Sequence, residues 1–302
     1  MIIQLRRDPC MIIRILMNAT LAAITCAQLS PIAQANTSQA LQEIGVILLG
    51  DQGKNNDGQK MVAAAMTRFC EKEKCDAVVL LGDNIYSSGV RSVRDKKFKT
   101  HFENHYSKLN IPFWAVLGNH DYGYGLMRGN VQAQVDYSAR STKWRMPARY
   151  YSFSIGRLEF IAIDTVALPK DPTQMAWLTQ KLSTDKLTQR IVVGHYPIHS
   201  SGMHGDNEFM NAKVSPLLCG KADVYAAGHD HHLEHTVTDC GVVQIVSGAG
   251  AETRTVEKQA RSQFASASLG FTYLRMMASG KLSVEYFNDS LELLAQFNLP
   301  TP

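Results

Sequence analysis

The sequence predicts an α/β protein in which two mixed β-sheets pack face to face and helices cover their outer faces. Short runs of Val, Ile, Leu and Ala recur along the chain, and each is closed by glycine, as buried strands are where they leave a sheet. Apolar residues at helical spacing in 58–70 place a helix between the first two runs, and a second helix is expected over 172–182. Segments 271–276 and 281–287 alternate in polarity, which indicates antiparallel strands near the C-terminus.

Five of the glycine-closed runs are followed at once by a residue that can bind a metal. A side chain that follows such a glycine points off the edge of the sheet. One junction of this kind is common, but five that carry Asp, Asn or His predict a single cluster of ligands at one edge of one sheet. The five residues are Asp51, Asp83, Asn119, His195 and His229.

The side chains at these junctions offer both oxygen and nitrogen donors. His231 adds a third imidazole, because alternate residues of GHDH (228–231) can face the same way, and Tyr86 lies three residues after Asp83. This set is larger than the four ligands of a tetrahedral site, and it suits two ions bridged by a carboxylate. Oxygen-rich ligation with imidazole favours iron, manganese or zinc, and a phenolate ligand favours ferric iron.

The motifs that carry these residues resemble the five blocks of the metallophosphoesterase superfamily, and Tyr86 narrows the resemblance to the purple acid phosphatases. The stretches between the blocks are similar to the small, single-domain, tartrate-resistant type known from mammals. The resemblance implies a four-layer sandwich of two mixed β-sheets flanked by helices. The blocks are DQG (51–53), GDNIY (82–86), GNHD (118–121), VVGH (192–195) and GHDH (228–231), and the intervening stretches are GNVQAQ (129–134), KWRMPARYY (143–151), GHYPI (194–198) and VSGAG (246–250).

The resemblance implies a centre of two metal ions, Fe(III) and a divalent ion that is Fe, Zn or Mn. Three departures from the family pattern affect the shape of the pocket and its regulation but remove no ligand. They are Gln52 in place of a tryptophan, a small insertion at 122–128, and a segment between Gly250 and Gly270 that is shorter than the mammalian loop. The carboxylate of Asp83 would bridge the two ions. The remaining ligands would be Asp51, Tyr86 and His231 for the ferric ion, and Asn119, His195 and His229 for the divalent ion.

The resemblance also implies an acid phosphatase that hydrolyses small phosphomonoesters by direct attack of metal-bound hydroxide, without a phosphoenzyme. His120 and His204 match the two outer-sphere histidines, which in the protonated form would hold phosphate oxygens and give a proton to the leaving alkoxide. The same scaffold also hydrolyses phosphodiesters, nucleotides or pyrophosphate, and the sequence does not choose among these substrates. The other alternative is a secreted protein that binds metal without catalysis, which would be expected to lose His120 or His204 first.

The first 35 residues are expected to be a secretory signal, so that a single domain spans 36–302. Three arginines precede a mostly apolar stretch at 15–24, and AQA (33–35) fits a cleavage site before Asn36. A membrane anchor is the alternative, but polar residues leave no apolar run of roughly 20 residues. A lipoprotein signal at Cys26 is a further alternative with a poor lipobox. We therefore expect a periplasmic or secreted protein with no stable membrane association.

The charge of the chain argues against a nucleic-acid partner. The 302 residues carry a net charge of only +4, and there is no long run of Lys and Arg. The partners expected are small phosphorylated substrates, and we expect the protein to be a monomer.

Export would leave four cysteines, Cys70, Cys75, Cys219 and Cys240, in an oxidising compartment, where two disulfides are expected. Of the three possible pairings, Cys70–Cys75 would close a short loop and Cys219–Cys240 would flank GHDH, and these two are favoured over free thiols. None of the four lies in the metal blocks, so a zinc–thiolate site is not expected.

Other polar residues near the blocks are expected to be structural. Asp121 and Asp164 would hold a ligand histidine or a turn, and Asp230 would point away from the metals. The remaining histidines are expected at the surface or in packing, with a place behind the ligands as the alternative for the last two: His101, His105, His199, His232 and His235.

Overall fold

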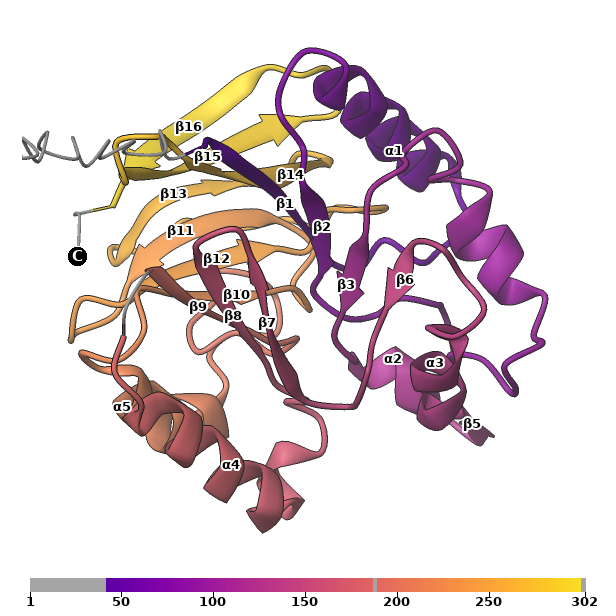
Figure 1. Cartoon of the computed structure of the whole chain (residues 1–302), viewed down its shortest axis with the longest axis horizontal. Helices are drawn as coiled ribbons and strands as arrows, with labels where there is room; N and C mark the ends of the chain where they lie inside the picture. The colour runs from indigo at the N-terminus through magenta and orange to yellow at the C-terminus, as the bar shows by residue number, and fades with distance from the viewer. Residues whose placement is uncertain (1–41, 187–188, 300–302) are drawn as a thin grey trace, which may run out of the picture. The chain divides into compact units, whose positions relative to one another are not determined.

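The computed structural model describes residues 42–186 and 189–299, which form two seven-stranded mixed sheets (Figure 1). The expected secretory signal and its cleavage site lie outside these residues. In the first sheet β1, β2, β3 and β6 run parallel, and β14 continues the sheet antiparallel to β1. The strand order is β16 (Leu293–Asn298), β15 (Leu282–Asn288), β14 (Gly270–Met276), β1 (Ile44–Leu49), β2 (Ala77–Leu80), β3 (Phe113–Ala115) and β6 (Trp144–Arg145).

The second sheet also has a parallel centre, formed by β8, β9, β10 and β12. Antiparallel strands flank this centre on both sides. The strand order is β13 (Ser262–Ser266), β11 (Leu233–Val237), β12 (Val243–Ser247), β10 (Val224–Ala227), β9 (Gln189–Val193), β8 (Leu158–Ala162) and β7 (Tyr151–Ile155). A separate two-stranded hairpin, β4 (Gly123–Tyr124) and β5 (Met127–Arg128), occupies the expected insertion.

The two sheets share one core, because the strands are buried on both faces. Ile191 and Val193 of β9 belong to the same hydrophobic cluster as Val46 and Leu48 of β1, whereas Val192 faces the opposite way and packs with the helices outside the second sheet. A strand buried on both sides needs apolar residues at every position. This requirement explains the continuous Val, Ile and Leu runs in the sequence.

Helix α1 (Asp57–Cys70) covers the outer face of the first sheet (Figure 1). It begins where the Asn56 side chain accepts a hydrogen bond from the backbone N–H of Gln59 at 2.9 Å, an N-cap that satisfies a free donor of the first turn. Val62, Met66 and Phe69 are buried on its inner side. The helix expected over 58–70 is therefore confirmed to within one residue.

Helix α4 (Pro172–Ser183) covers the outer face of the second sheet together with α5 (Ser215–Leu218) and a helical turn at Met210–Val214 (Figure 1). Asp171 caps α4 by accepting a hydrogen bond from Gln174 N at 2.9 Å. The remaining helical segments are α2 (Asn119–Tyr122), α3 (Val131–Tyr137), Phe98–Glu103 and Leu168–Lys170. Helix, sheet, sheet and helix make the four layers that were expected.

Two disulfides join the four cysteines in the favoured pairing. Cys70 and Cys75 close the turn after α1, with Cα atoms 5.5 Å apart. Cys219, after α5, pairs with Cys240 between β11 and β12, with Cα atoms 5.6 Å apart. The second disulfide closes a loop that contains β10 and the GHDH segment. Across the described residues, no helix is both long and apolar enough to cross a membrane.

Candidate metal centre

The candidate ligands follow the carboxyl ends of parallel strands in both sheets. Asp51 and Asp83 follow β1 and β2, whereas His195 and His229 follow β9 and β10. The expectation of one edge of one sheet was therefore wrong. The sheets meet at this point: the side chain of Asp51 accepts a hydrogen bond from His229 N at 2.8 Å, and Gly50 N donates to Ser247 O at 2.7 Å.

One side of the centre contains the three side chains that were expected at the ferric ion. The hydroxyl of Tyr86 lies 3.0 Å from Asp51 Oδ1 and 3.2 Å from His231 Nε2. The distance from His231 Nε2 to Asp51 Oδ1 is 3.6 Å. A carboxylate oxygen, a phenol oxygen and an imidazole nitrogen therefore point at one another from three separate segments.

The other side contains residues that were expected at the divalent ion. His195 Nε2 lies 2.9 Å from Asn119 Oδ1 and 3.5 Å from Asp83 Oδ1. The rings of His195 and His229 are 5.0 Å apart. Asp83 lies between the two sides, since ligand atoms of Asp51, Asp83 and His195 all come within 4.8 Å of one another.

The two histidines expected to act on the substrate flank this group. The ring of His120 packs against Tyr86 at 4.5 Å, and its Nε2 lies 4.0 Å from Asp83 Oδ2. The ring of His204 stacks on His229 at 4.2 Å. All nine site residues expected from the sequence are thus present at one place.

Backbone geometry holds three of the candidate ligands in an unusual conformation. Asp51, Asp83 and His229 have φ values of 59°, 52° and 71°, in the left-handed region that residues other than glycine rarely adopt. Such conformations persist only where the surrounding structure enforces them, and they concentrate at functional sites. The neighbouring glycines mainly allow close approach: a Cβ on Gly118 would lie 2.3 Å from Asp83 Oδ1, and one on Gly228 would lie 2.5 Å from Asp51 Oδ2.

Hydrogen bonds from outside the centre orient the donor atoms. His195 Nδ1 donates to the carbonyl oxygen of Leu81 at 2.9 Å, which turns Nε2 toward Asn119 Oδ1 and Asp83 Oδ1. Asp83 Oδ1 also accepts from His120 N at 2.8 Å. The buried Nδ1 of His231 has no hydrogen-bond partner within the described ranges.

The buried carboxylates of the candidate centre favour the binding of a cation. Asp51 and Asp83 are 0% and 2% exposed, and neither pairs with Lys or Arg among the residues described. Burial opposes ionisation of Asp51, but the adjacent His231 and the other nearby histidines outweigh burial and lower its pKa to about 2. Burial, followed by the charges of Asp51 and Asp83, raises the pKa of Tyr86 well above its usual value. Buried carboxylates are stable when they are paired or bind metal, so this donor set fits metal ions.

Burial also keeps the candidate ligand His229 neutral. Burial first, and then the charge of His195, lowers the pKa of His229 to about 2. A neutral imidazole is the form that binds a metal, so His229 is ready for ligation without losing a proton.

The three aspartates expected to be structural lie beside the centre. Asp121 accepts hydrogen bonds from Gly118 N at 2.8 Å and from Asn84 N and Ile85 N at 3.2 Å, which fixes the turns that carry Asp83 and Asn119. Asp164 accepts from the Tyr122 hydroxyl at the base of the β4–β5 hairpin. The carboxyl of Asp230 accepts hydrogen bonds from Ser200 Oγ and His204 N.

The structure also places residues that the sequence did not single out. Arg254 Nη1 lies 3.2 Å from His204 Nε2, and the backbone N–H of Arg254 donates to His231 O at 2.9 Å. Lys54 pairs with Glu252 and lies 4.6 Å above the ring of Tyr86. No spacing rule connects these cations with the motifs, because they come from loops of different sheets.

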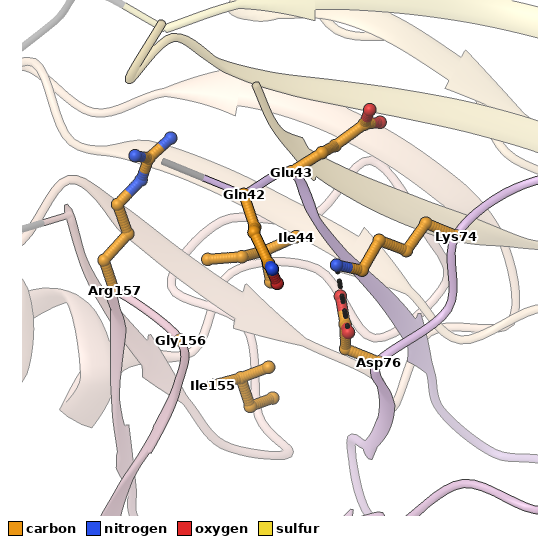
Figure 2. A pocket seen from close by; sticks show the side chains of 8 residues that line it. All are labelled: Gln42, Glu43, Ile44, Lys74, Asp76, Ile155, Gly156 and Arg157. Atoms are coloured by element: carbon orange, nitrogen blue, oxygen red, sulfur yellow. Dashed lines mark ion pairs between the residues drawn. The ribbon is translucent and has the colours of Figure 1, made fainter. Parts of the chain in front are cut away.

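A pocket at the opposite end of β1 is not part of this centre. Figure 2 shows that Lys74 and Asp76 face each other there, in an ion pair at 3.6 Å. The pocket lies where β1 begins, whereas the candidate ligands follow the carboxyl end of that strand. Its lining residues are Gln42, Glu43, Ile44, Lys74, Asp76, Ile155, Gly156 and Arg157.

Comparisons with known proteins agree with this geometry. The family described as calcineurin-like phosphoesterase matches residues 45–233. Tartrate-resistant acid phosphatase type 5 of Rattus norvegicus is 32% identical, over 79% of this chain and 83% of the relative. Purple acid phosphatase 4 of Arabidopsis thaliana is 31% identical, over 68% of each protein.

Solved structures share the fold at lower identity. The purple acid phosphatase PPD1 from yellow lupin (Lupinus luteus) seeds superimposes with a TM-score of 0.71 at 18% identity, over 85% of this chain and 53% of that one. GAP50, described as the anchor in the inner membrane complex of Plasmodium, gives a TM-score of 0.76 at 24% identity, over 86% and 89%.

Two facing mixed sheets with carboxylates, imidazoles and a phenol at their common edge define a metal-dependent phosphoesterase. The chain belongs to the calcineurin-like phosphoesterase family and, within it, to the purple acid phosphatases, with similarity to the tartrate-resistant type. It is accordingly an acid phosphatase, an enzyme that hydrolyses phosphoesters.

Proposed function

We propose that the protein is an exported acid phosphatase that hydrolyses small phosphomonoesters at a centre of two metal ions. The observation that carries this proposal is the cluster around Asp51, Asp83 and His195, whose ligand atoms lie within 4.8 Å of one another in a buried place. Tyr86, Asn119 and the GHDH histidines extend the cluster to either side. Seven donors exceed the need of one ion and match two.

Each ion would be held by its own set of side chains. Asp83, between the sets, would contact both ions. Ions held here supply positive charge to the phosphate oxygens and lower the pKa of a water molecule. We assign Asp51, Tyr86 and His231 to Fe(III), and Asn119, His195 and His229 to a divalent Fe, Zn or Mn ion.

His120 and His204 would act on the substrate. The Nδ1–H of His120 donates to the carbonyl oxygen of Ser87 at 2.7 Å, which turns Nε2 toward Asp83 and the centre. His204 lies over His229 on the other side. A protonated imidazole in either position can hold a phosphate oxygen, and one of them can give a proton to the departing alkoxide.

The enzyme's own nucleophilic side chains have other tasks, which supports direct hydrolysis without a phosphoenzyme. Asp51 and Asp83 are assigned to the metals, and the four cysteines from Cys70 to Cys240 are in disulfides. Direct attack inverts the configuration at phosphorus, whereas a phosphoenzyme gives retention through two inversions. A substrate with a chiral, isotopically labelled phosphoryl group therefore tests this part, and retention would refute it.

Export is supported by the two disulfides, since such bonds persist in oxidising compartments. We assign the protein to the periplasm or the exterior of the cell. N-terminal sequencing of protein from its native host should find Asn36 as the first residue. A full-length cytoplasmic form as the main species would contradict this assignment.

The catalytic assignment is tested with substrates that differ in their leaving group. His204→Ala and His120→Ala should keep both metals, and at least one should lose turnover on an alkyl phosphate by about 10²–10⁴-fold, the usual range for general acid catalysis. The loss should be much smaller on nitrophenyl phosphate, whose leaving group hardly needs a proton. An equal loss on both substrates for both variants would mean that these histidines only bind phosphate.

The fold alone does not separate catalysis from a purely structural role, because an anchor protein shares it. What favours catalysis here is the presence of both His120 and His204 beside the complete donor set. A protein that only binds metal has no need for either.

A further inference from the structure

His204 lies on a loop that is hydrogen-bonded to two buried carboxylates. We call residues 200–204 the histidine loop. It follows β9 and the candidate ligand His195, and it is hydrogen-bonded to the segment that joins β10 to β11. Both carboxylates, Asp230 and Glu234, come from that segment and its strand, and they are 1% and 0% exposed.

Asp230 binds both ends of the histidine loop. Its Oδ2 accepts a hydrogen bond from Ser200 Oγ at 2.5 Å, and its Oδ1 accepts from the backbone N–H of His204 at 3.2 Å. The middle of the loop packs directly on the same carboxylate, because a Cβ on Gly202 would lie 2.6 Å from the Asp230 carboxyl carbon. The Asp230 side chain therefore contacts the beginning, the middle and the end of the histidine loop.

Glu234 binds the next residue of the loop. It accepts hydrogen bonds from Ser201 N at 3.0 Å and Ser201 Oγ at 2.6 Å, and it also accepts from His232 Nε2 at 2.8 Å and from the hydroxyl of Ser262. Ser201 Oγ lies 2.9 Å from Ser262 Oγ. The loop is thus joined to β11 and to the start of β13 through one buried group.

Hydrogen bonds to a charged acceptor are about twice as strong as neutral ones, and a buried charge needs every partner it has. Four of these bonds come from a loop of five residues that contains no regular secondary structure. A proton donor must lie within hydrogen-bond reach of the departing oxygen, and small displacements are costly. The hydrogen bonds that fix the histidine loop therefore also fix the point at which the ring of His204 can meet a substrate.

We infer that Asp230 and Glu234 are positioning residues, which hold the histidine loop so that His204 can deliver its proton to the leaving group. This inference rests on the proposed role of His204. It assigns a task to the residue between the two GHDH histidines and to the glutamate that follows them. Neither carboxylate would touch the substrate.

The test removes a loop hydroxyl and leaves the carboxylates and the candidate ligands unchanged. Ser200→Ala should lower kcat on an alkyl phosphate about tenfold, which is the worth of one hydrogen bond to a charged group, and lower kcat on nitrophenyl phosphate less than about twofold. Ser201→Ala should show the same pattern. Metal content and thermal melting, measured on each variant, confirm that the protein is folded and loaded.

Ser283→Ala is the matched control. Ser283 is 0% exposed, and its hydroxyl donates to Glu285 Oε1 at 2.8 Å on β15. The Ser283→Ala variant therefore loses the same kind of hydrogen bond, but outside the centre. Its kcat on both substrates should equal that of the unchanged enzyme. If Ser200→Ala and Ser201→Ala behave like this control, or lose activity equally on both substrates, the inference is overturned.

A double variant separates this inference from the proposed function. If Ser200 acts through His204, then Ser200→Ala should cost nothing further in a His204→Ala background, whereas independent effects would multiply. Multiplication would overturn the positioning role and leave the role of His204 intact. If His204→Ala alone shows no dependence on the leaving group, the proposed function of His204 is wrong, and the positioning role is wrong with it.

Discussion

Replacing Glu234 with glutamine should make the stability of the protein depend on pH in a defined way. Glu234 is fully buried and ionised, and its two oxygens accept from Ser201, His232 and Ser262. Burial raises the pKa of this carboxyl, but these hydrogen bonds outweigh burial, with His232 first, and lower the pKa from 4.5 to about 2. Glutamine keeps the shape of the side chain but removes the charge.

The size of the effect follows from the two pKa values. A tenfold difference in proton affinity corresponds to about 1.4 kcal/mol, so the gap between 4.5 and about 2 corresponds to about 3 kcal/mol. Because the pKa is lower in the folded state, this contribution is complete above pH 4.5 and is lost as the pH falls toward 2. The Glu234→Gln variant should therefore be less stable by about 3 kcal/mol at pH 7, and the difference should shrink through this range.

Urea unfolding of both proteins, followed at intervals from pH 7 down to pH 3, measures the difference directly. The candidate metal ligands titrate in both proteins, so their contribution to the free energy of unfolding cancels in the difference. Asp57→Asn is the control, because Asp57 pairs with Lys60 on the exposed face of α1 and should change the free energy of unfolding very little. A difference between Glu234→Gln and the unchanged protein that stays constant over this pH range would refute the reasoning.

Three further predictions concern the centre itself. Protein loaded with iron should be violet or pink, because the Tyr86 phenol points at Asp51 and His231. The Tyr86→Phe variant should keep its iron but be colourless. An iron-loaded wild type without colour would contradict the assignment of Tyr86 to the ferric ion. Elemental analysis should find that Asp83→Asn loses both metals, whereas Asn119→Ala loses mainly the divalent one. If both variants lose only a single metal, Asp83 does not bridge the two ions. Arg254→Met should raise KM for phosphate esters about tenfold, because the Arg254 guanidinium faces His204 and has no carboxylate partner among the described residues. The control Arg261→Met loses only the ion pair with Asp206 and should leave KM unchanged.

Local signals were sufficient for much of the fold. The segment 58–70 has an apolar face and follows its N-cap Asn56, and the runs before Gly50 and Gly194 form strands that are buried on both faces. These features depend on residues close together in the chain. The strand β16 was not expected, because its pattern is weak and it lies half-exposed at the edge of the first sheet.

The sequence did not predict which strands, far apart in the chain, pair in the same sheet. Nothing in the runs before Asp51 and His229 shows that β1 and β10 belong to different sheets, since both are equally apolar. The residue types and the glycine junctions were enough to propose the seven candidate ligands, whereas His120 and His204 were proposed only from the resemblance to the purple acid phosphatases. The contact of Arg254 with His204 was not foreseeable, because the two residues are 50 positions apart and each is unremarkable alone.

The left-handed backbone at Asp51, Asp83 and His229 restricts how this centre can change in evolution. Side chains branched at Cβ are excluded there, and Asp and Asn are tolerated best. Tyr86, Asn119, His195 and His231 do not share this conformation, so the backbone sets no such limit on a replacement there. Natural or designed changes of the candidate ligands should therefore be restricted most at the three left-handed positions.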